Sequence, residues 1–305
     1  MRVISYIHNG NPGVGVMVDD EGFVALSNAA PDLPDNLRGI LEVDPDLDKV
    51  RATTEGKPAD MSVSDVSFDP VIPAPHATWA LALNYKLHIE ETGLTTSTDY
   101  PQIFHRLPIS QVGHGEELWA PDLKIAESYD YEGELAVIIG KPGRFIQVEN
   151  AFEHVAGYSC YNEGSVREYQ SQNRQFGLGK NFERSGSFGP WLMTRDEFGD
   201  PAGHRLITRL NGIERQNSPI SDLLFNVPKL VAFLSEGYTL QPGDVIVTGS
   251  PGALPLNPGE KPETPRGNVV VEGQLHMRAG DVCEVEIDGL GTLSNSVITD
   301  PTPLP

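Results

Sequence analysis

The chain has 305 residues, of which 39% are hydrophobic and 21% charged, a balance typical of a globular protein in water. Its 43 acidic and 22 basic residues give a formal net charge of −21 at pH 7, which argues against nucleic acid or anionic membranes as partners. No apolar run is long enough to span a membrane, no signal-peptide core precedes the first turn, and the two cysteines form no disulfide framework, so we expect a cytoplasmic protein.

The first 70 residues differ in pattern from the rest of the chain. The stretch "VISYIHNGNPGVGVMVDDEGFVAL" alternates and carries turn signals at "NGNPG" and "DDEG", which predicts a small antiparallel meander. "DNLRGILEV" predicts a short amphipathic helix, and "EGKPADMSVSDVSFDPVIPAP" is a polar connector that contains proline. We therefore place a boundary near residue 70, between a small β-rich N-terminal domain (1–70) and a second domain (71–305).

The second domain is predicted to be mainly β, with few helices. It carries none of the glycine-rich loops that bind dinucleotides or nucleoside triphosphates, and no repeat of solenoid period. Together the two parts predict a mixed, mainly-β (α+β) fold. Strands are predicted over 79–83, 134–139, 154–160, 206–210, 244–248, 269–271 and 282–287, and helices over 86–92, 165–172 and 227–235.

A pair of glutamates stands at the entrance of one predicted strand. In "SYDYEGELAVIIG", Glu132 and Glu134 are two residues apart and project to the same face, where like charges repel. A hard divalent cation, either Mg²⁺ or Mn²⁺, with Ca²⁺ as a further candidate, would make the arrangement tolerable. An isolated pair of this kind is more often simply solvated, so further acidic residues are needed to indicate a metal site.

Glu163 supplies a third carboxylate where a predicted strand meets a predicted helix. In "VAGYSCYNEGSVREYQ", Glu163, Arg167 and Gln170 are spaced i, i+4 and i+7, so a helix would place all three on one face. Lys180 follows among glycines, which let backbone approach a ligand closely, although a surface lysine in a loop is an equally good interpretation. Polar groups aligned beside a buried strand favour a site over a solvated surface.

His88 and Glu91, in "ALNYKLHIEETG", would lie one turn apart on a short helix. A carboxylate beside an imidazole fixes its tautomer and raises its basicity, which suits a general base near neutral pH. A surface pair is the simpler interpretation of these two residues alone. The small polar residues that follow favour a lid that closes over substrate.

Several sequence blocks occur together in a recognisable order. They are "ALNYKLHIEETG", "PQIFHRLPISQVGHGEELWAP", "DYEGELAVIIGK", "AGYSCYNEGSVREYQ", "GKNFERSGSFGPWLMTRDE", "LQPGDVIVTGSPGAL" and "VEIDGLGTLSNSV". The set resembles the lid segment, the metal-strand signature and the C-terminal blocks of the fumarylacetoacetate hydrolase family. The resemblance covers about residues 78–298, nearly the whole second domain.

The resemblance implies a rolled β-sandwich catalytic domain with a metal between strands, a small N-terminal domain in front, and a homodimer. It implies that Glu132, Glu134 and Glu163 ligate Mg²⁺ or Mn²⁺. It further implies roles for two groups of residues. The catalytic group is His88, Glu91 and Lys180, and the substrate-binding group is Arg106, Arg167, Gln170 and Thr248.

The chain departs from the family pattern at several positions. The third metal ligand is Asp in most relatives and Glu163 here, and "RE" replaces "RD" at 167–168. Ala82 stands where relatives carry Gly. "TGSP" replaces "TGTP", and the proline-rich loop that follows, about residues 252–273, is longer than usual, so we expect this loop to shape the substrate pocket.

The resemblance and the site chemistry together predict a small-molecule 2-oxo acid as substrate. We expect a metal-dependent hydrolase that cleaves a C–C bond in an acylpyruvate-type or fumarylpyruvate-type 2-oxo acid. An oxaloacetate-type decarboxylase is the close alternative, because loss of CO₂ leaves the same enolate, and a hydratase or isomerase of unsaturated 2-oxo acids comes next. A binder that kept the fold and lost the chemistry is a more remote alternative.

Overall fold

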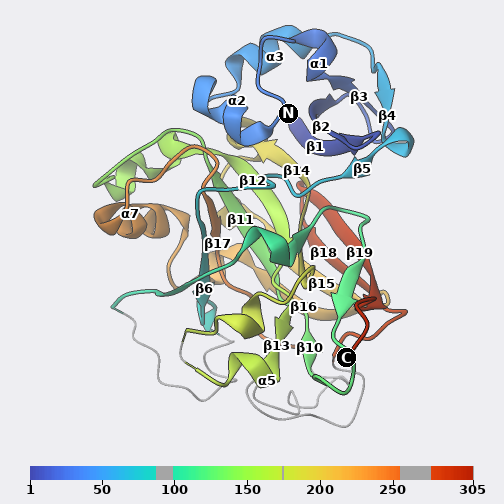
Figure 1. Cartoon of the computed structure of the whole chain (residues 1–305). Coiled ribbons are helices and arrows are strands. Elements are labelled where there is room, and N and C mark those ends of the chain that lie inside the picture. The colour runs from blue at the N-terminus through green and yellow to red at the C-terminus, as the bar shows by residue number, and fades with distance from the viewer. Residues whose placement is uncertain (87–98, 174, 255–275, 305) are drawn as a thin grey trace.

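The computed structural model describes residues 1–86, 99–173, 175–254 and 276–304 (Figure 1). The strands are β1 (Arg2–His8), β2 (Asn11–Met17), β3 (Gly22–Ala25), β4 (Met61–Ser62), β5 (Ser67–Phe68), β6 (Thr78–Ala82), β7 (Gln102–His105), β8 (Gln111–Val112), β9 (Leu118–Ala120), β10 (Tyr129–Asp130), β11 (Gly133–Ile139), β12 (Val155–Asn162), β13 (Ser165–Val166), β14 (Gly186–Thr194), β15 (Arg205–Leu210), β16 (Ile213–Pro219), β17 (Val245–Val247), β18 (Val282–Ile287) and β19 (Gly291–Thr299). The helices are α1 (Leu26–Ala29), α2 (Leu37–Val43), α3 (Asp48–Thr54), α5 (Arg167–Gln170), α6 (Arg195–Phe198) and α7 (Val227–Gly237). Short 3₁₀ turns are η1 (Val63–Asp65), η2 (Pro108–Ser110), η3 (Val148–His154), η4 (Leu178–Lys180), η5 (Pro201–Gly203) and η6 (Ile220–Asp222). The predicted mixed, mainly-β class is confirmed.

One large mixed sheet connects the N-terminal lobe at the top of Figure 1 to the rest of the molecule. Its order is β4-β3-β2-β1-β14-β12-β11-β17-β6-β7, with β5 on β1 and β8 on β14. The predicted meander forms β1 to β3, and Asn9 and Gly10 make the first turn with positive φ angles of 52° and 77°. Because β1 pairs with β14, the N-terminal strands extend the sheet that carries the site.

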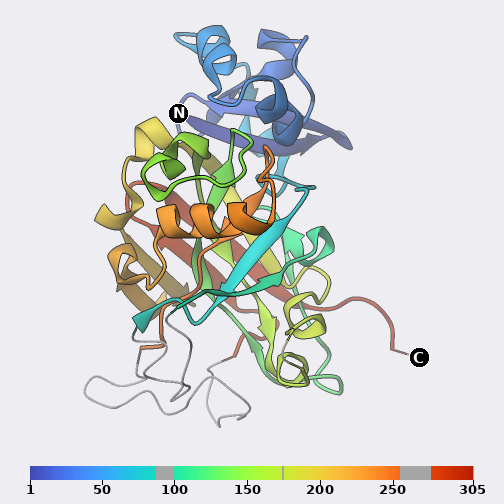
Figure 2. The same cartoon turned by 90° about the vertical axis from the view of Figure 1, so that its left-hand side faces the viewer.

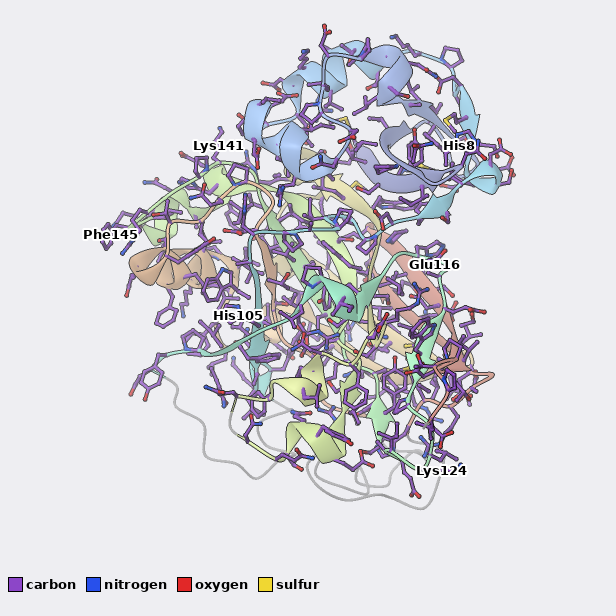
Figure 3. All side chains as sticks on the ribbon, in the orientation of Figure 1. His8, His105, Glu116, Lys124, Lys141 and Phe145 are labelled. Carbon is purple, nitrogen blue, oxygen red and sulfur yellow. The ribbon has the colours of Figure 1, made fainter. Side chains whose placement is uncertain are left out.

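The N-terminal lobe combines a small core of its own with contacts to the main body. Its own core contains Ile4, Tyr6, Met17, Phe23 and Ala25. The predicted helix is present as α2, which Asn36 caps by accepting a hydrogen bond from Gly39 N. Lys141, labelled to the lower left of the lobe in Figure 3, forms an ion pair with Asp46 at 2.8 Å. The boundary near residue 70 stays a prediction.

Strands β11 and β12 lie in the middle of the large sheet. Every residue of both strands is buried, which explains their nearly continuous apolar sequences. They pair antiparallel from Gly133 opposite Asn162 to Ile138 opposite Gly157. The strands predicted over 134–139 and 154–160 are confirmed, with ends displaced by one or two residues.

A second sheet, of order β16-β15-β18-β19-β9, packs against the large one. The core between them brings together Leu135 and Val137 of β11 with Leu206, Val285 and Leu293 of the second sheet. Helix α7, orange in Figure 2, lies across the front and buries Leu230, Val231 and Leu234 in the same core. The arrangement is a β-sandwich whose central strands lead to the candidate site.

The helix predicted over 165–172 is wrong in its first turn. Ser165 and Val166 form the short strand β13, which pairs with β10, and only Arg167–Gln170 is helical. Ser165 is held extended because its hydroxyl donates to Glu132 Oε1 and to the Glu163 carbonyl, while Val166 is fully buried. Glu163, Arg167 and Gln170 therefore do not share one helical face.

Two further predictions concern segments that are not described. The strand predicted over 269–271, and all but the first residue of the helix predicted over 86–92, lie outside the described residues. Within the described part of the chain, no helix combines the length and apolar character that crossing a membrane requires.

Candidate metal centre

Three glutamates converge where β11 begins and β12 ends. Glu132 immediately precedes β11, Glu134 is its second residue, and Glu163 immediately follows β12. One oxygen from each carboxylate lies within 4.8 Å of those of the other two. All three side chains are buried, with exposed fractions of 6%, 0% and 1%. The three carboxylates that the resemblance implies as metal ligands therefore lie together, and their binding of a metal stays a prediction.

The local structure explains this convergence. Antiparallel pairing sets Gly133 opposite Asn162, and Glu163 N donates a hydrogen bond of 2.8 Å to the Glu132 carbonyl. Gly133 cannot carry a side chain, because a Cβ there would lie 2.0 Å from Thr208 Oγ1 on the second sheet. The glycine between the two glutamates thus lets the sheets approach closely while both carboxylates face the same side.

Two cations contact the three glutamates, and one of them, Lys180, bridges two. Lys180 Nζ lies 2.9 Å from Glu132 Oε1 and 2.7 Å from Glu163 Oε2, and Arg167 Nη1 lies 2.7 Å from Glu132 Oε1. The Lys180 ammonium also sits 5.1 Å from the ring centre of Phe104, a cation–π contact. Lys180 is only 3% exposed, so the interpretation of a surface loop lysine is wrong.

The negative charge of the three glutamates is nevertheless only partly balanced by these two cations and by hydrogen-bond donors. Among the described residues, no hydrogen-bond donor reaches Glu134 Oε1 or Glu163 Oε1. Burial raises the pKa of Glu134 well above its ordinary value, and the charges of Glu163 and Glu132 raise it further. Burial also raises the pKa of Glu163, against the opposing effect of Lys180. Proximity and burial thus favour a bound cation or protons at this site.

The residues fit a hard divalent cation. Four carboxylates, including Asp130, face Lys180, Arg167 and Arg106, so negative charge is in excess when all are ionised. The two oxygens without a described donor belong to Glu134 on β11 and to Glu163 just after β12, and they are of the ligand type that Mg²⁺ and Mn²⁺ prefer. The structure therefore supports a group of three buried carboxylates that could hold a metal ion.

The residues expected to bind substrate lie around this cluster in different ways. Gln170 Oε1 accepts from Arg167 Nη1 at 2.6 Å, so the two side chains form one unit. Thr248 is fully buried, and its hydroxyl has no partner among the described residues. Arg106 is 2% exposed and donates to the Gly164 carbonyl at 2.8 Å, which places it behind Glu163. Of the expected catalytic residues, His88 and Glu91 lie outside the described residues, and their role stays a prediction.

Three functional neighbours escaped the sequence reasoning. Asp130 Oδ2 accepts from Arg167 Nε at 3.0 Å and Nη2 at 2.6 Å, and Ser165 and Ser250 each donate to Glu132. Burial alone would lower the pKa of Arg167, but the charges of Glu132 and Asp130 outweigh burial and raise it. Asp130 precedes Glu132 by two residues, so the alternation that singled out the glutamates could have included it.

Comparisons with known proteins identify the family of this chain. Residues 77–298 match the family described as fumarylacetoacetate (FAA) hydrolase, C-terminal. The chain is 33% identical over 301 residues to oxaloacetate tautomerase YisK of Bacillus subtilis, covering 93% of this chain and 95% of that one. It is 35% identical over 219 residues, 72% of each chain, to 2,4-didehydro-3-deoxy-L-rhamnonate hydrolase of Sphingomonas sp..

A solved structure extends the comparison to a liganded protein. The maleylpyruvate hydrolase from Sphingobium sp. SYK-6, in complex with manganese(II) ion and pyruvate, superposes with a TM-score of 0.76 at 25% identity, over 98% of this chain and 99% of that one. The shared fold, the alignment with YisK over nearly the full length of both chains, and the family match over residues 77–298 lead to one conclusion. The chain belongs to the fumarylacetoacetate hydrolase family.

Proposed function

We propose that this protein is a divalent-metal-dependent enzyme that interconverts the keto and enol forms of an oxaloacetate-type 2-oxo acid. The observation that carries the proposal is the convergence of three buried glutamates, two of them with an oxygen that no described donor reaches, beside Lys180 and Arg167. Support for this substrate class comes from the relative named oxaloacetate tautomerase, which aligns with 93% of the chain. We place tautomerisation ahead of the C–C hydrolysis expected from sequence because two relatives named oxaloacetate tautomerase are 31–33% identical over 93–98% of the chain. The maleylpyruvate hydrolase is 25% identical, and the rhamnonate hydrolase aligns with 72% of the chain.

Glu132, Glu134 and Glu163 would hold the metal, which we expect to be Mg²⁺ or Mn²⁺. Manganese is named in the structure of the related maleylpyruvate hydrolase. When bound, such an ion supplies Lewis acidity that polarises the 2-oxo group of the substrate. Oxygen ligands seldom discriminate strongly between these two ions, so both are to be tested.

The protein's own residues supply binding and proton transfer. Tautomerisation moves a proton between C3 and the C2 oxygen of the substrate, and negative charge develops on that oxygen in between. Lys180 provides positive charge at this place, and its Nζ can donate a hydrogen bond to the oxygen, while we expect Arg167 to bind a substrate carboxylate. We expect Gln170, tied to Arg167, and the Thr248 hydroxyl to orient the substrate carboxylates.

A base is still required at C3. We infer from the family resemblance that His88, oriented by Glu91, accepts this proton. Neither residue is among those described, so the assignment rests on sequence alone. His88→Ala is expected to lower the rate ~10²–10⁴-fold if the imidazole is the general base, whereas a non-catalytic binder would show no change.

C–C hydrolysis of an acylpyruvate is the second candidate. The likeness to maleylpyruvate hydrolase and to a rhamnonate hydrolase specifically supports it. In that reaction water adds to the distal carbonyl, the C–C bond breaks, and the pyruvate enolate leaves. Loss of CO₂ from oxaloacetate would generate an enolate as well, so decarboxylation is measured alongside.

One set of assays separates these reactions. The purified protein with Mg²⁺ or Mn²⁺ is mixed with enol-oxaloacetate, and loss of the enol's ultraviolet absorption, release of CO₂, and cleavage of acetylpyruvate and fumarylpyruvate are followed. We expect rapid loss of enol without CO₂, in excess of metal alone and of the Glu163→Gln variant. Cleavage of an acylpyruvate with no effect on the enol would establish the hydrolase instead, and inactivity in every assay would support a binder.

The oligomeric state is a separate proposal. We infer from the family resemblance that the protein forms a homodimer. Light scattering after size-exclusion chromatography measures the mass directly, and a value equal to the 33.2 kDa chain would contradict the dimer.

A further inference from the structure

The loop at residues 248–251 donates hydrogen bonds to two of the three candidate ligands. Gly249 N donates a hydrogen bond to Glu134 Oε2, and Ser250 Oγ donates to Glu132 Oε2 at 3.2 Å. When one oxygen of a carboxylate accepts a hydrogen bond from the loop, the direction of its second oxygen is fixed as well. For Glu134 that other oxygen, Oε1, is the one with no donor among the described residues.

Two buried side-chain amides, Asn84 and Gln216, fasten the two ends of this loop. We propose that they are positioning residues, which fix the 248–251 loop and thereby aim Glu132 and Glu134 at the metal. This inference rests on the metal centre of the proposed function. Among the described residues, the hydrogen bonds of both amides go to backbone groups, so each would act through the backbone of the loop or of the ligand strand.

Asn84 fastens the first end. It is 1% exposed, and its Nδ2 donates to the Thr248 carbonyl at 2.7 Å and to the Phe225 carbonyl at 3.0 Å, while its Oδ1 accepts from Phe225 N at 2.8 Å. Both amide hydrogens are therefore used, and only a primary amide offers two donors and an acceptor in this small space. Asn84 thus links the loop to the chain just before α7.

The packing at Gly249 brings the loop backbone close to the Asn84 side chain. Gly249 has a φ of +93°, which favours glycine, and a Cβ there would lie 2.9 Å from Asn84 Cβ and 3.3 Å from the Leu81 carbonyl. Glycine lets the loop backbone press against Asn84 and aim its N–H at Glu134. The side chain that holds the loop and the residue that delivers the hydrogen bond are thus in direct contact.

Gln216 fastens the second end. It lies on β16 of the second sheet and is completely buried. Its Nε2 donates to the Pro251 carbonyl at 2.7 Å, and its Oε1 accepts from Gly133 N at 2.9 Å. Because Gly133 lies between Glu132 and Glu134, one side chain joins the end of the loop to the strand that carries both ligands.

The experiment compares these amides with a buried amide that serves only the fold. Asn295 is 2% exposed and donates to the Gly113 and Glu116 carbonyls, both at 2.8 Å. Within the described part of the chain, neither hydrogen bond reaches the three candidate ligands. Asn84→Ala, Gln216→Ala and Asn295→Ala are prepared without metal. Their thermal stability is measured, and Mn²⁺ is titrated while its free-ion electron paramagnetic resonance signal is followed.

We expect all three variants to lose stability, because each leaves buried backbone groups without partners. Asn84→Ala and Gln216→Ala should in addition weaken Mn²⁺ binding by ~10–100-fold, the usual cost of losing a residue that orients a ligand. Asn295→Ala should keep the Mn²⁺ dissociation constant within about twofold, because its described hydrogen bonds reach neither the glutamates of the cluster nor the 248–251 loop. Because Thr248 lies in the same loop, Asn84→Ala should also raise KM more than it lowers kcat.

Gentler variants keep the test decisive where an alanine variant does not fold. Gln216→Met preserves volume, and Asn84→Asp preserves the acceptor for Phe225 N but removes the donors to Thr248 and Phe225. Unchanged Mn²⁺ affinity in the folded variants, or an equal loss in Asn295→Ala, would overturn the positioning role alone. Failure of the unmodified protein to bind Mn²⁺ would overturn the metal centre, and with it the proposed function.

Discussion

The two walls of the candidate metal centre are held in place by different forces. The anionic wall, Glu132, Glu134 and Glu163, extends from β11 and β12, in which every residue is buried and paired across the ladder. The cationic wall, Arg167 and Lys180, comes from α5 and η4. Lys180 is buried, but none of the four residues of α5 is. Packing fixes the first wall, whereas a four-residue helix is too short to be stable by itself.

Polar contacts hold the second wall against the first. Glu168 accepts from the backbone nitrogens of Glu127 at 2.7 Å and Ser128 at 3.0 Å, and Arg167 N donates to the Ser128 carbonyl at 3.0 Å. The Arg167 and Lys180 side chains then reach the carboxylates directly. The anionic wall should therefore keep its shape when a charge is removed, while the cationic wall should depend on the charges it faces.

Removing a charge from the anionic wall tests this difference most strongly. Glu134→Gln removes a candidate ligand, so we expect activity to fall on the order of 10³-fold and Mn²⁺ binding to weaken severely. The metal-free protein should become more stable, because a neutral amide replaces a buried carboxyl whose pKa is raised. Thermal unfolding without metal and Mn²⁺ titration check the two effects. A metal-free variant that unfolds at a lower temperature would show that the charge itself supports this wall.

Removing a charge from the cationic wall should have the opposite effect on stability. Lys180→Met leaves Glu132 and Glu163 without their shared cation, so we expect a loss of about 3 kcal/mol without metal and ~10²-fold in rate. Saturating Mn²⁺ should restore part of the stability. The control is Lys141→Met, because the Lys141–Asp46 pair is roughly two-fifths exposed and should contribute less than about 1 kcal/mol. Equal effects of the two variants would contradict the contrast between the walls.

A milder change loosens Arg167 without removing it. Asp130→Asn weakens the contact that receives both Nε and Nη2 of Arg167, so we expect KM to rise ~10-fold with a smaller change in kcat. Steady-state kinetics measure the two constants separately. Asp196→Asn is the matched control, because its contact with Arg51 at 2.6 Å lies on the surface. A fall in kcat with unchanged KM would place Arg167 in the chemical step instead of substrate binding.

The anionic wall was more accessible to sequence reasoning than the cationic one. The two-residue spacing of Glu132 and Glu134 follows from strand geometry, and the buried strands on either side were visible as apolar runs. The extended conformation at Ser165 was not visible, because it depends on a hydrogen bond from Ser165 to Glu132, 33 residues away. Local periodicity therefore favoured a helix where a tertiary contact imposes a strand.

Long-range partners explain the other omissions. Strand β14 was not predicted, because its sequence "GSFGPWLMT" contains glycine and proline, which disfavour strands, yet it lies between β1 and β12 in the large sheet. Asn84 and Gln216 lie 141 residues from Phe225 and 83 residues from Gly133, respectively. No periodic pattern joins such positions, so only the folded chain reveals that they act on one loop.

Asp244 offers a test of the packed strands alone, with the smallest expected effect, because it lies beside these strands and away from the carboxylate cluster. It is fully buried, its Oδ1 accepts from Ala77 N at 3.0 Å, and its Oδ2 accepts from Gln241 N at 2.7 Å. Burial raises its pKa from 3.8 to about 6 despite these two donors. The folded protein therefore binds the Asp244 proton more tightly than the unfolded chain does.

The sign of the pH dependence follows from that difference. The protonated carboxyl contributes stability that is fully present below pH 3.8 and is lost as the pH rises through about 6. At about 1.4 kcal/mol per pKa unit, this group should add at most about 2–3 kcal/mol on acidification from pH 7 to 4. Asp244→Asn should be less stable at every pH, since its NH₂ faces a backbone N–H, but should lack this share of the slope. Urea unfolding of the metal-free proteins at several pH values measures the difference between the two slopes. Identical slopes would mean that Asp244 has the same pKa in the folded and unfolded protein. A change in kcat/KM at pH 7 beyond the loss of folded protein would mean that Asp244 influences the candidate site.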